Sequence, residues 1–187
     1  MKKIDRRVAR TRKALADAPI SLTKEKDYDQ ITIRDLTERA DVGYATFYRH
    51  YKSKDELLSQ FVRRVAQDVW DQIKPEMSPY EEALAMFKAL EPHRDGILLG
   101  LSFPREHPVM KPAWDDVMDK VLALYAAKDE SAIPLDVSVN HLMNSVVELI
   151  RWWLVEGQDY SPEQMATIQS ELIFKVTESV ALDNQYR

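Results

Sequence analysis

Apolar residues recur every three or four positions along most of the chain, which is the spacing of one face of an α-helix. Leu15, Ala18 and Leu22 illustrate it and predict a first helix over about residues 6–24, with a kink or break at Pro19, which lacks an N–H. No run of alternating apolar and polar residues and no Asn-Gly hairpin turn indicates a strand. The chain is therefore expected to be all-α.

Capping and turn residues divide this pattern into separate helices. Thr32 and Asp35 form a capping box for a short helix. Asp41, which tolerates the left-handed conformation, and Gly43, which permits a tight entry to the next helix, then supply a turn. Further helices are expected over residues 44–51, from a cap at Ser53 to before Pro75, and over residues 79–90, 94–103, 109–128, 135–156 and 162–182.

Charge is distributed unevenly along the chain. The net charge of -5 comprises +6 through Lys54 and −11 beyond it. A basic segment joined to an acidic body is typical of a nucleic-acid contact attached to a regulatory or assembly domain. Taken by itself, a block such as residues 1–13 is equally often a solvated face.

Composition and motif content exclude several classes of protein. The chain has no cysteine, and no apolar run approaches the roughly 20 residues that span a bilayer. It contains no phosphate-binding loop, no dinucleotide-binding glycine pattern, and no GxSxG or HExxH motif. We therefore expect a cytoplasmic protein that is not an enzyme, uses no cofactor or metal, and does not contact a membrane.

One segment, TFYRHYKSKDEL at residues 46–57, carries the most specific pattern of the chain. Together with TIRDL at 32–36 and ADV at 40–42, it makes residues 8–58 resemble the DNA-binding domain of the TetR family of transcriptional repressors. The resemblance implies a helix-turn-helix domain over residues 1–58, a linking helix that continues to about 74, and a helical ligand-binding and dimerisation domain over residues 75–187. The chain departs from the family at two positions: the family commonly has Gly at position 41 and an apolar helix former at position 19, where this chain has Asp41 and Pro19.

The resemblance also implies a homodimer that binds a palindromic double-stranded DNA operator and represses transcription. Tyr44, Ala45 and Thr46 are expected to meet base edges, while Tyr48 and neighbouring polar residues meet phosphates. For Tyr48 a core position is the weaker alternative; Leu36, Phe47, Tyr51 and Leu57 are expected in the core. The predicted DNA contacts are Thr32, Arg34, Gly43, Tyr44, Ala45, Thr46, Tyr48, His50, Lys52 and Lys54.

Two helices near the C-terminus carry wide apolar faces, which two copies of the chain would pair into a four-helix bundle. The alternative is that both faces cover the core of a single chain. With the family resemblance, dimerisation is the favoured interpretation. The predicted interface residues are Val147, Ile150, Leu154, Ile168, Leu172 and Val176.

A small-molecule effector is expected to bind among the Met and aromatic residues of the middle helices, although such residues are more often ordinary core. The predicted pocket residues are Phe87, Phe103, Met110, Trp114, Met118 and Met143. An apolar or aromatic ligand fits these pocket residues. The nearby basic residues favour a ligand with an anionic end, whereas the acidic body favours one with a cationic end. These basic residues are His93, Arg94, Arg105 and His107. The alternative is an effector-independent regulator or a helical protein-interaction module.

Overall fold

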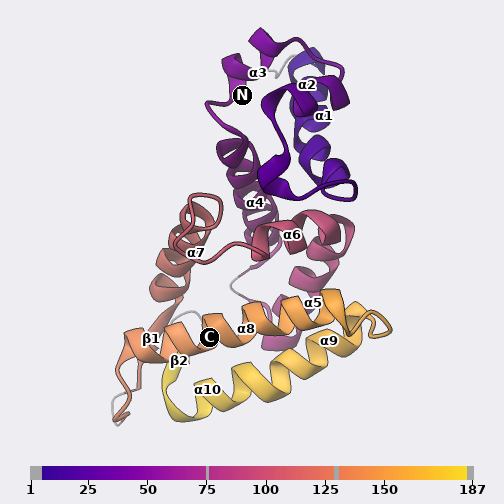
Figure 1. Ribbon diagram of the computed structural model, residues 1–187. Coiled ribbons are helices and arrows are strands. Elements are labelled where there is room, and N and C mark those ends of the chain that lie inside the picture. The colour runs from indigo at the N-terminus through magenta and orange to yellow at the C-terminus, as the bar shows by residue number, and fades with distance from the viewer. Residues whose placement is uncertain (1–5, 75, 129–130, 185–187) are drawn as a thin grey trace.

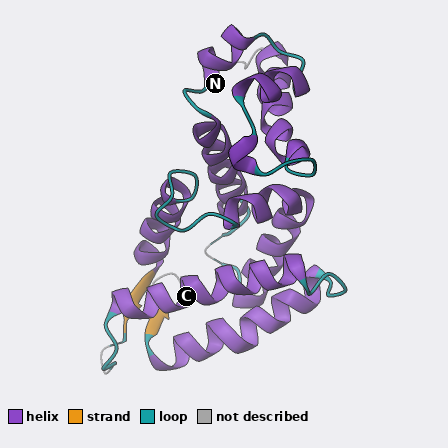
Figure 2. Cartoon of the chain, in the orientation of Figure 1, coloured by secondary structure: helices purple, strands orange, loops and turns teal. Residues whose placement is uncertain are grey.

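The computed structural model describes residues 6–74, 76–128 and 131–184, and most of them are helical (Figure 2). The first part contains α1 (Arg6–Leu22), the 3-10 turn η1 (Tyr28–Gln30), α2 (Ile33–Arg39), α3 (Tyr44–His50) and α4 (Lys54–Trp70). The second contains α5 (Pro79–Leu90), η2 (Glu91–His93), α6 (Arg94–Leu101), α7 (Lys111–Leu124), α8 (Leu135–Val155), α9 (Pro162–Gln169), a π-helical turn (Ser170–Phe174) and α10 (Lys175–Val180). The all-α prediction is confirmed.

The first three helices and the start of α4 enclose a small core at one end of the molecule (Figure 1). Phe47 and Leu36 are fully buried there, and Tyr51 and Leu57 almost fully, which confirms their prediction as core residues. The members of this cluster are Leu15, Ala18, Leu22, Ile31, Leu36, Phe47, Tyr51 and Leu57. Packing on one side of α3 leaves its opposite side free to face outward.

Helix α4 connects this end to the rest of the chain. Leu57 belongs to the small core, whereas Leu58, Phe61, Val65 and Val69 belong to the large one. The boundary between the two cores therefore falls between Leu57 and Leu58, which are adjacent residues of α4. The domain boundary near residue 58 stays a prediction, because the division of the cores does not test whether either part folds alone.

Helix α6 packs closely against α4 and α1 because it presents glycines to them. A Cβ at Gly96 would lie 2.4 Å from the ring of Phe61 and 2.8 Å from Ile20. A Cβ at Gly100 would lie 2.8 Å from Val62. This close approach holds the second part of the chain against the first.

The end of the molecule away from α3 is formed by α8 and by α9 with α10, which run side by side (Figure 1). Phe87 of α5 packs edge-to-face on Trp153 of α8, with ring centres 5.1 Å apart, in the large core. Among the described helices, none is long and apolar enough to cross a membrane.

Three local features differ from the sequence predictions. Helix α1 has no break at Pro19 and continues to Leu22, because the proline removes one hydrogen bond close to the helix end and its own carbonyl accepts from Thr23 at 3.0 Å; a kink there stays a prediction. The helix expected over 109–128 ends at Leu124, and strand β1 (Tyr125–Ala127) pairs antiparallel with β2 (Leu182–Asn184). The last helix is interrupted by the π-helical turn. Residues 1–5 of the basic block and Pro75 lie outside the described residues.

Candidate DNA-binding surface and inner cavity

The turn between α2 and α3 depends on Asp41, which has a φ of 53°. This is the left-handed conformation predicted for it, and a short polar side chain adopts it more readily than most residues do. Gly43 has a φ of -69° and a ψ of 146°, and a Cβ there would meet only Thr46 Oγ1, at 3.8 Å. Gly43 thus permits the entry to α3, as expected, but residues with a side chain also fit this backbone.

The outer face of α3 presents two tyrosines. Tyr44 and Tyr48 are 55% and 48% exposed, and their rings meet edge-to-face at 5.2 Å. Their hydroxyl oxygens lie 3.4 Å apart, and this contact raises the pKa of Tyr48. The alternative that Tyr48 belongs to the core is excluded by its exposure. Ala45 on the same helix is exposed, and Thr46 is half-buried and accepts a hydrogen bond from Arg49 at 2.7 Å.

The start of α2 is fixed by the predicted capping box. The Thr32 hydroxyl accepts from the backbone N–H of Asp35, and the Asp35 carboxylate accepts from the backbone N–H of Thr32 at 2.7 Å. Lys26 also pairs with Asp35 at 2.7 Å, and these contacts, Lys26 first, hold the pKa of Asp35 well below its usual range. Arg34 is exposed and pairs with Glu38 at 2.8 Å. Thr32 and Arg34 thus remain at the surface, as candidates for contact.

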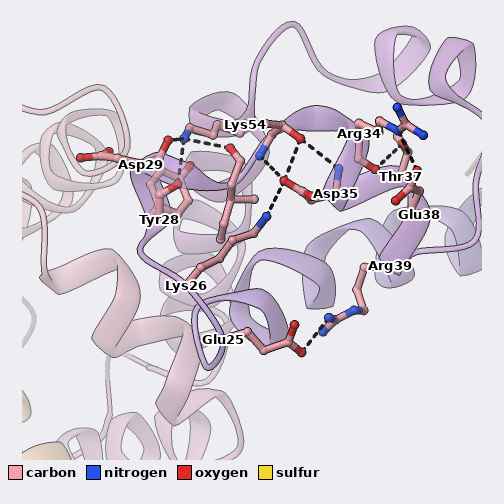
Figure 3. Close-up of polar contacts among 12 residues, drawn as sticks. Glu25, Lys26, Tyr28, Asp29, Arg34, Asp35, Thr37, Glu38, Arg39 and Lys54 are labelled. Carbon is pink, nitrogen blue, oxygen red and sulfur yellow. Dashed lines mark hydrogen bonds and ion pairs between the residues drawn. The ribbon is translucent and has the colours of Figure 1, made fainter.

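Lys54, one of the predicted phosphate contacts, is bonded within the chain in the structure. Its Nζ donates to the carbonyls of Tyr28 at 2.8 Å, Asp29 at 3.1 Å and Ile31 at 3.1 Å (Figure 3). An ammonium has three donors, so these bonds use all of them. Lys54 therefore fixes the η1 loop to the start of α4. Sequence reasoning missed this because the partners are backbone atoms more than twenty residues away.

A group of basic residues borders the C-terminal end of α3. His50 lies near Arg12 of α1 and Arg49, and its partial burial, followed by these two charges, lowers its pKa. Burial raises the pKa of Tyr51, and the positive charge of Arg64 of α4, which lies near it, acts in the opposite direction. Sequence reasoning did not assign Arg12 or Arg64 to the site, although the basic block at the N-terminus was a signal for the first. Lys52, beside them, is exposed.

Helix α4 and the second part of the chain line a partly open apolar pocket of about 220 Å³, named the inner cavity. Met110, Trp114 and Met143 line it, as predicted. The other lining residues come from α4 and the segment directly after it, α5, α7, β1, α8, α9 and the π-helical turn. They are Val62, Ala66, Val69, Trp70, Ile73, Glu82, Met86, Leu90, Ala113, Val117, Val121, Leu124, Tyr125, Leu142, Val146, Val147, Ile150, Gln169 and Phe174.

The prediction was wrong for the other three pocket residues. Phe87 is fully buried against Trp153 in the core. Phe103 packs instead on Tyr28, at 5.1 Å between ring centres. Met118 is half-buried and lies against the large core, outside the cavity wall. The helical spacing identified the apolar faces but not which part of each face borders a void.

Three predicted interface residues belong to the interior of a single chain. Ile150 and Leu154 are buried, and Val147 lines the cavity, because this face of α8 covers the chain's own core. Ile168 is half-buried. By contrast, Leu172 and Val176 are 70% and 54% exposed, and Val180, four residues further on, is 56% exposed. These three residues, named the outer apolar row, follow helical spacing along the last helix.

The basic residues considered as partners for an anionic ligand do not line the cavity. His93 and Arg94 border a separate polar groove near Asp17 and Lys24. Arg105 lies over the ring of Trp114, 5.2 Å from its centre. His107 stacks on Phe103 at 4.5 Å, and its Nδ1 accepts from the backbone N–H of Val109.

Comparisons with known proteins agree with this arrangement. Residues 15–61 match the sequence model of a family described as bacterial regulatory proteins, tetR family. The uncharacterized HTH-type transcriptional regulator YxbF of Bacillus subtilis (strain 168) is 32% identical over 173 residues, which cover 88% of this chain and 45% of YxbF. The HTH-type transcriptional repressor KstR of Rhodococcus jostii (strain RHA1) is 38% identical over 53 residues, which cover 28% of this chain and 25% of KstR.

A solved structure extends the similarity to both parts of the chain. The TetR transcriptional regulator from Streptococcus agalactiae 2603V superposes with a TM-score of 0.64 at 27% identity, over 90% of this chain and 96% of that one. The chain spans less than half the length of the two curated relatives. The matched proteins are named as transcriptional regulators or repressors. Residues 15–61 of the chain therefore form a domain of the tetR family of bacterial regulatory proteins.

Proposed function

We propose that this chain is a repressor that binds a palindromic DNA operator as a homodimer and is released from DNA by a small molecule in the inner cavity. The observation that carries the proposal is the exposed outer face of α3, with Tyr44 and Tyr48 open to solvent while Phe47 anchors the helix from behind. A helix held in this way fits the major groove and places its first residues against base edges. Such a regulator acts where the chromosome lies, and we place it in the cytoplasm.

The contacts divide into two classes. Tyr44, Ala45 and Thr46, at the start of α3, are proposed to read base edges, with Gly43 allowing close approach. Tyr48, His50 and Lys52 are proposed to contact phosphates, with Thr32 and Arg34 at the edge of the groove. Arg12 beside His50 and Arg64 beside Tyr51 add positive charge and join the phosphate class, whereas Lys54 leaves it.

The outer apolar row supports dimerisation. Leu172, Val176 and Val180 are spaced four residues apart on a surface that a second copy can cover, and exposed apolar rows of this kind mark contact sites. A two-fold axis through this end of the molecule gives two copies of α3, which predicts an operator with two related half-sites.

Selection of bound sequences from a random DNA library tests the proposal. We expect an enriched palindrome, bound more weakly by Tyr48→Ala and with relaxed preference at one base position by Thr46→Ala. Tyr80→Ala is the matched control, because Tyr80 is an exposed tyrosine on α5, 36% accessible and far along the chain from α3. Recovery of no enriched sequence by a folded protein would refute the proposal.

A further inference from the structure

The inner cavity contains one polar group with an unmet requirement. Gln169 is 2% exposed and lines the cavity, and its Oε1 has no hydrogen-bond partner among the described residues. Buried polar atoms in proteins are nearly always paired, because an unpaired one is unfavourable. A donor supplied by a ligand would meet this requirement. The terminal torsion of a glutamine is broad, so the amide can turn its oxygen toward such a ligand.

The backbone after Gln169 is irregular, and this changes which side chains face the cavity. Ser170–Phe174 form a π-helical turn, in which the N–H of Lys175 donates to the carbonyl of Ser170, five residues earlier. In a regular α-helix, residues five apart point about 140° away from each other. The π-helical bonding brings such residues closer to one side, and Gln169 and Phe174 both line the cavity. Single π turns inside α-helices frequently occur at functional sites.

The charge of the wall selects against one kind of ligand. Glu82 of α5 is the one charged residue among the described residues that line the cavity. The other polar lining groups are the Trp70 and Trp114 indoles and Tyr125, whose hydroxyl donates to Glu178 at 3.4 Å. A buried anion beside a carboxylate, with no cation on the wall, would be strongly disfavoured. A hydroxyl or an amide N–H carries no net charge to bury, and an ammonium, which does, is attracted by the Glu82 carboxylate.

We propose that the cavity binds a compact apolar or aromatic molecule with one hydrogen-bond donor end, neutral or cationic, which donates to Oε1 of Gln169 and lies on the side of Glu82. This inference rests on the proposed function for the cavity and adds the chemical class of its ligand. The volume of about 220 Å³ suits a substituted single ring. A dry engineered cavity of about 150 Å³ holds benzene.

Four probes that share one ring test the inference: toluene, benzyl alcohol, benzylamine and benzoate. Binding to the full chain is measured by calorimetry and by the shift of its melting temperature. We expect benzyl alcohol and benzylamine to bind about tenfold more tightly than toluene, and benzoate not to bind. Tightest binding of benzoate, or binding of none of the four by a folded chain, would overturn the inference.

Two variants identify the groups responsible. Gln169→Leu keeps a side chain of similar volume, so toluene is expected to bind at least as well as before. Benzyl alcohol should then bind with about the same affinity as toluene. Gln169→Met repeats the test with a more flexible side chain. Glu82→Gln should lower the affinity for benzylamine and leave that for benzyl alcohol unchanged. A donor preference that persists in both Gln169 variants contradicts the inference.

DNA binding is measured separately on the same preparations, so that the two proposals fail in different ways. If the donor probes bind through Gln169 but leave operator affinity unchanged, the ligand class stands and effector release is refuted. If operator binding weakens only with benzoate, the ligand class is refuted and effector release stands.

Discussion

The ammonium of Lys54 lies 4.6 Å from the centre of the Tyr28 ring and donates to the Tyr28 carbonyl at 2.8 Å. The Tyr28 hydroxyl in turn donates to Asp55 at 3.0 Å. Burial, reinforced by the Asp55 carboxylate, raises the pKa of Tyr28 far above its usual value, so the hydroxyl stays protonated and remains a donor. The η1 loop and the first turn of α4 are therefore joined by contacts in both directions.

Replacing Lys54 should affect folding more than DNA binding. Lys54→Ala leaves three carbonyls without their donor; a hydrogen bond to a charged group contributes a net of about 1.5–3 kcal/mol, and water can replace part of the loss because Lys54 is only half-buried. We expect the free energy of unfolding to fall by roughly 2 kcal/mol, as measured by urea denaturation.

Lys52→Ala is the matched control, since Lys52 is exposed and adjacent to the same helix start. Its stability should be nearly unchanged, whereas the slope of log affinity against log salt should decrease by about one. The reverse result, a salt effect in Lys54→Ala at full stability, would restore Lys54 to the phosphate contacts.

His50 predicts a pH dependence of DNA binding. Its pKa lies below the usual value of 6.5, so the ring is neutral at pH 7 in the free protein. A phosphate beside the ring would raise its pKa in the complex, and a group with a higher pKa in the complex takes up a proton on binding. DNA affinity should therefore rise as the pH falls through the pKa of the complex, by at most about tenfold per unit, and level off below the pKa of the free protein.

Operator titrations between pH 5 and 8 measure this effect. His50→Gln should flatten the profile, whereas His141→Gln, an exposed histidine on α8, should leave it unchanged. A profile of the same slope in His50→Gln would show that His50 does not meet phosphate.

Local signals in the sequence predicted most helix starts correctly. Thr32 with Asp35, and Ser161 with Gln164, form capping boxes whose partners are three residues apart, so the pattern is legible without tertiary information. Asp41 is another local signal, because its own backbone carries the left-handed conformation.

Features that depend on distant parts of the chain were missed. The pairing of β1 with β2 joins Tyr125 to Asn184, and the Lys54 bonds reach back to η1. Periodicity shows that α8 has an apolar face, but Leu154 is buried within one chain while Leu172 on the last helix is exposed, and the two are equally apolar. Tertiary packing decides whether an apolar helix face is covered by the same chain or stays exposed, and the sequence pattern does not show that packing.

Leu172 should be essential for dimerisation but not for folding. Leu172→Glu places a carboxylate at a position that is 70% exposed in the single chain, so the monomer tolerates it. In a dimer that covers the outer apolar row, the carboxylate has no partner. Each copy then loses roughly 1–3 kcal/mol or more, so association weakens by several kcal/mol. Light scattering should show a folded monomer.

Val147→Glu makes the contrasting variant. Val147 lines the apolar cavity, so its replacement by glutamate should destabilise the fold itself. A Leu172→Glu protein that remains a dimer would place the interface on another surface.

The last prediction concerns communication between the cavity and the DNA-binding surface. Met110 lines the cavity, and its backbone N–H donates to the His107 carbonyl at 2.9 Å. The His107 ring stacks on Phe103, and Phe103 meets Tyr28 edge-to-face at 5.1 Å. Tyr28 is one of the three residues whose carbonyls bind Lys54, so these contacts form a continuous path from the cavity wall to the start of α4.

Contiguity alone does not establish coupling, so the coupling factor must be measured. It is the ratio of operator dissociation constants with and without a saturating ligand, and it is independent of either affinity alone. In Phe103→Ala the path loses its central ring, and we expect the factor to fall toward one while ligand and operator each still bind. Tyr28→Phe keeps the ring contact and should retain most of the coupling. Full coupling in Phe103→Ala would mean that the signal passes through α4 and the Gly96 contact instead, because these also join the two parts of the chain.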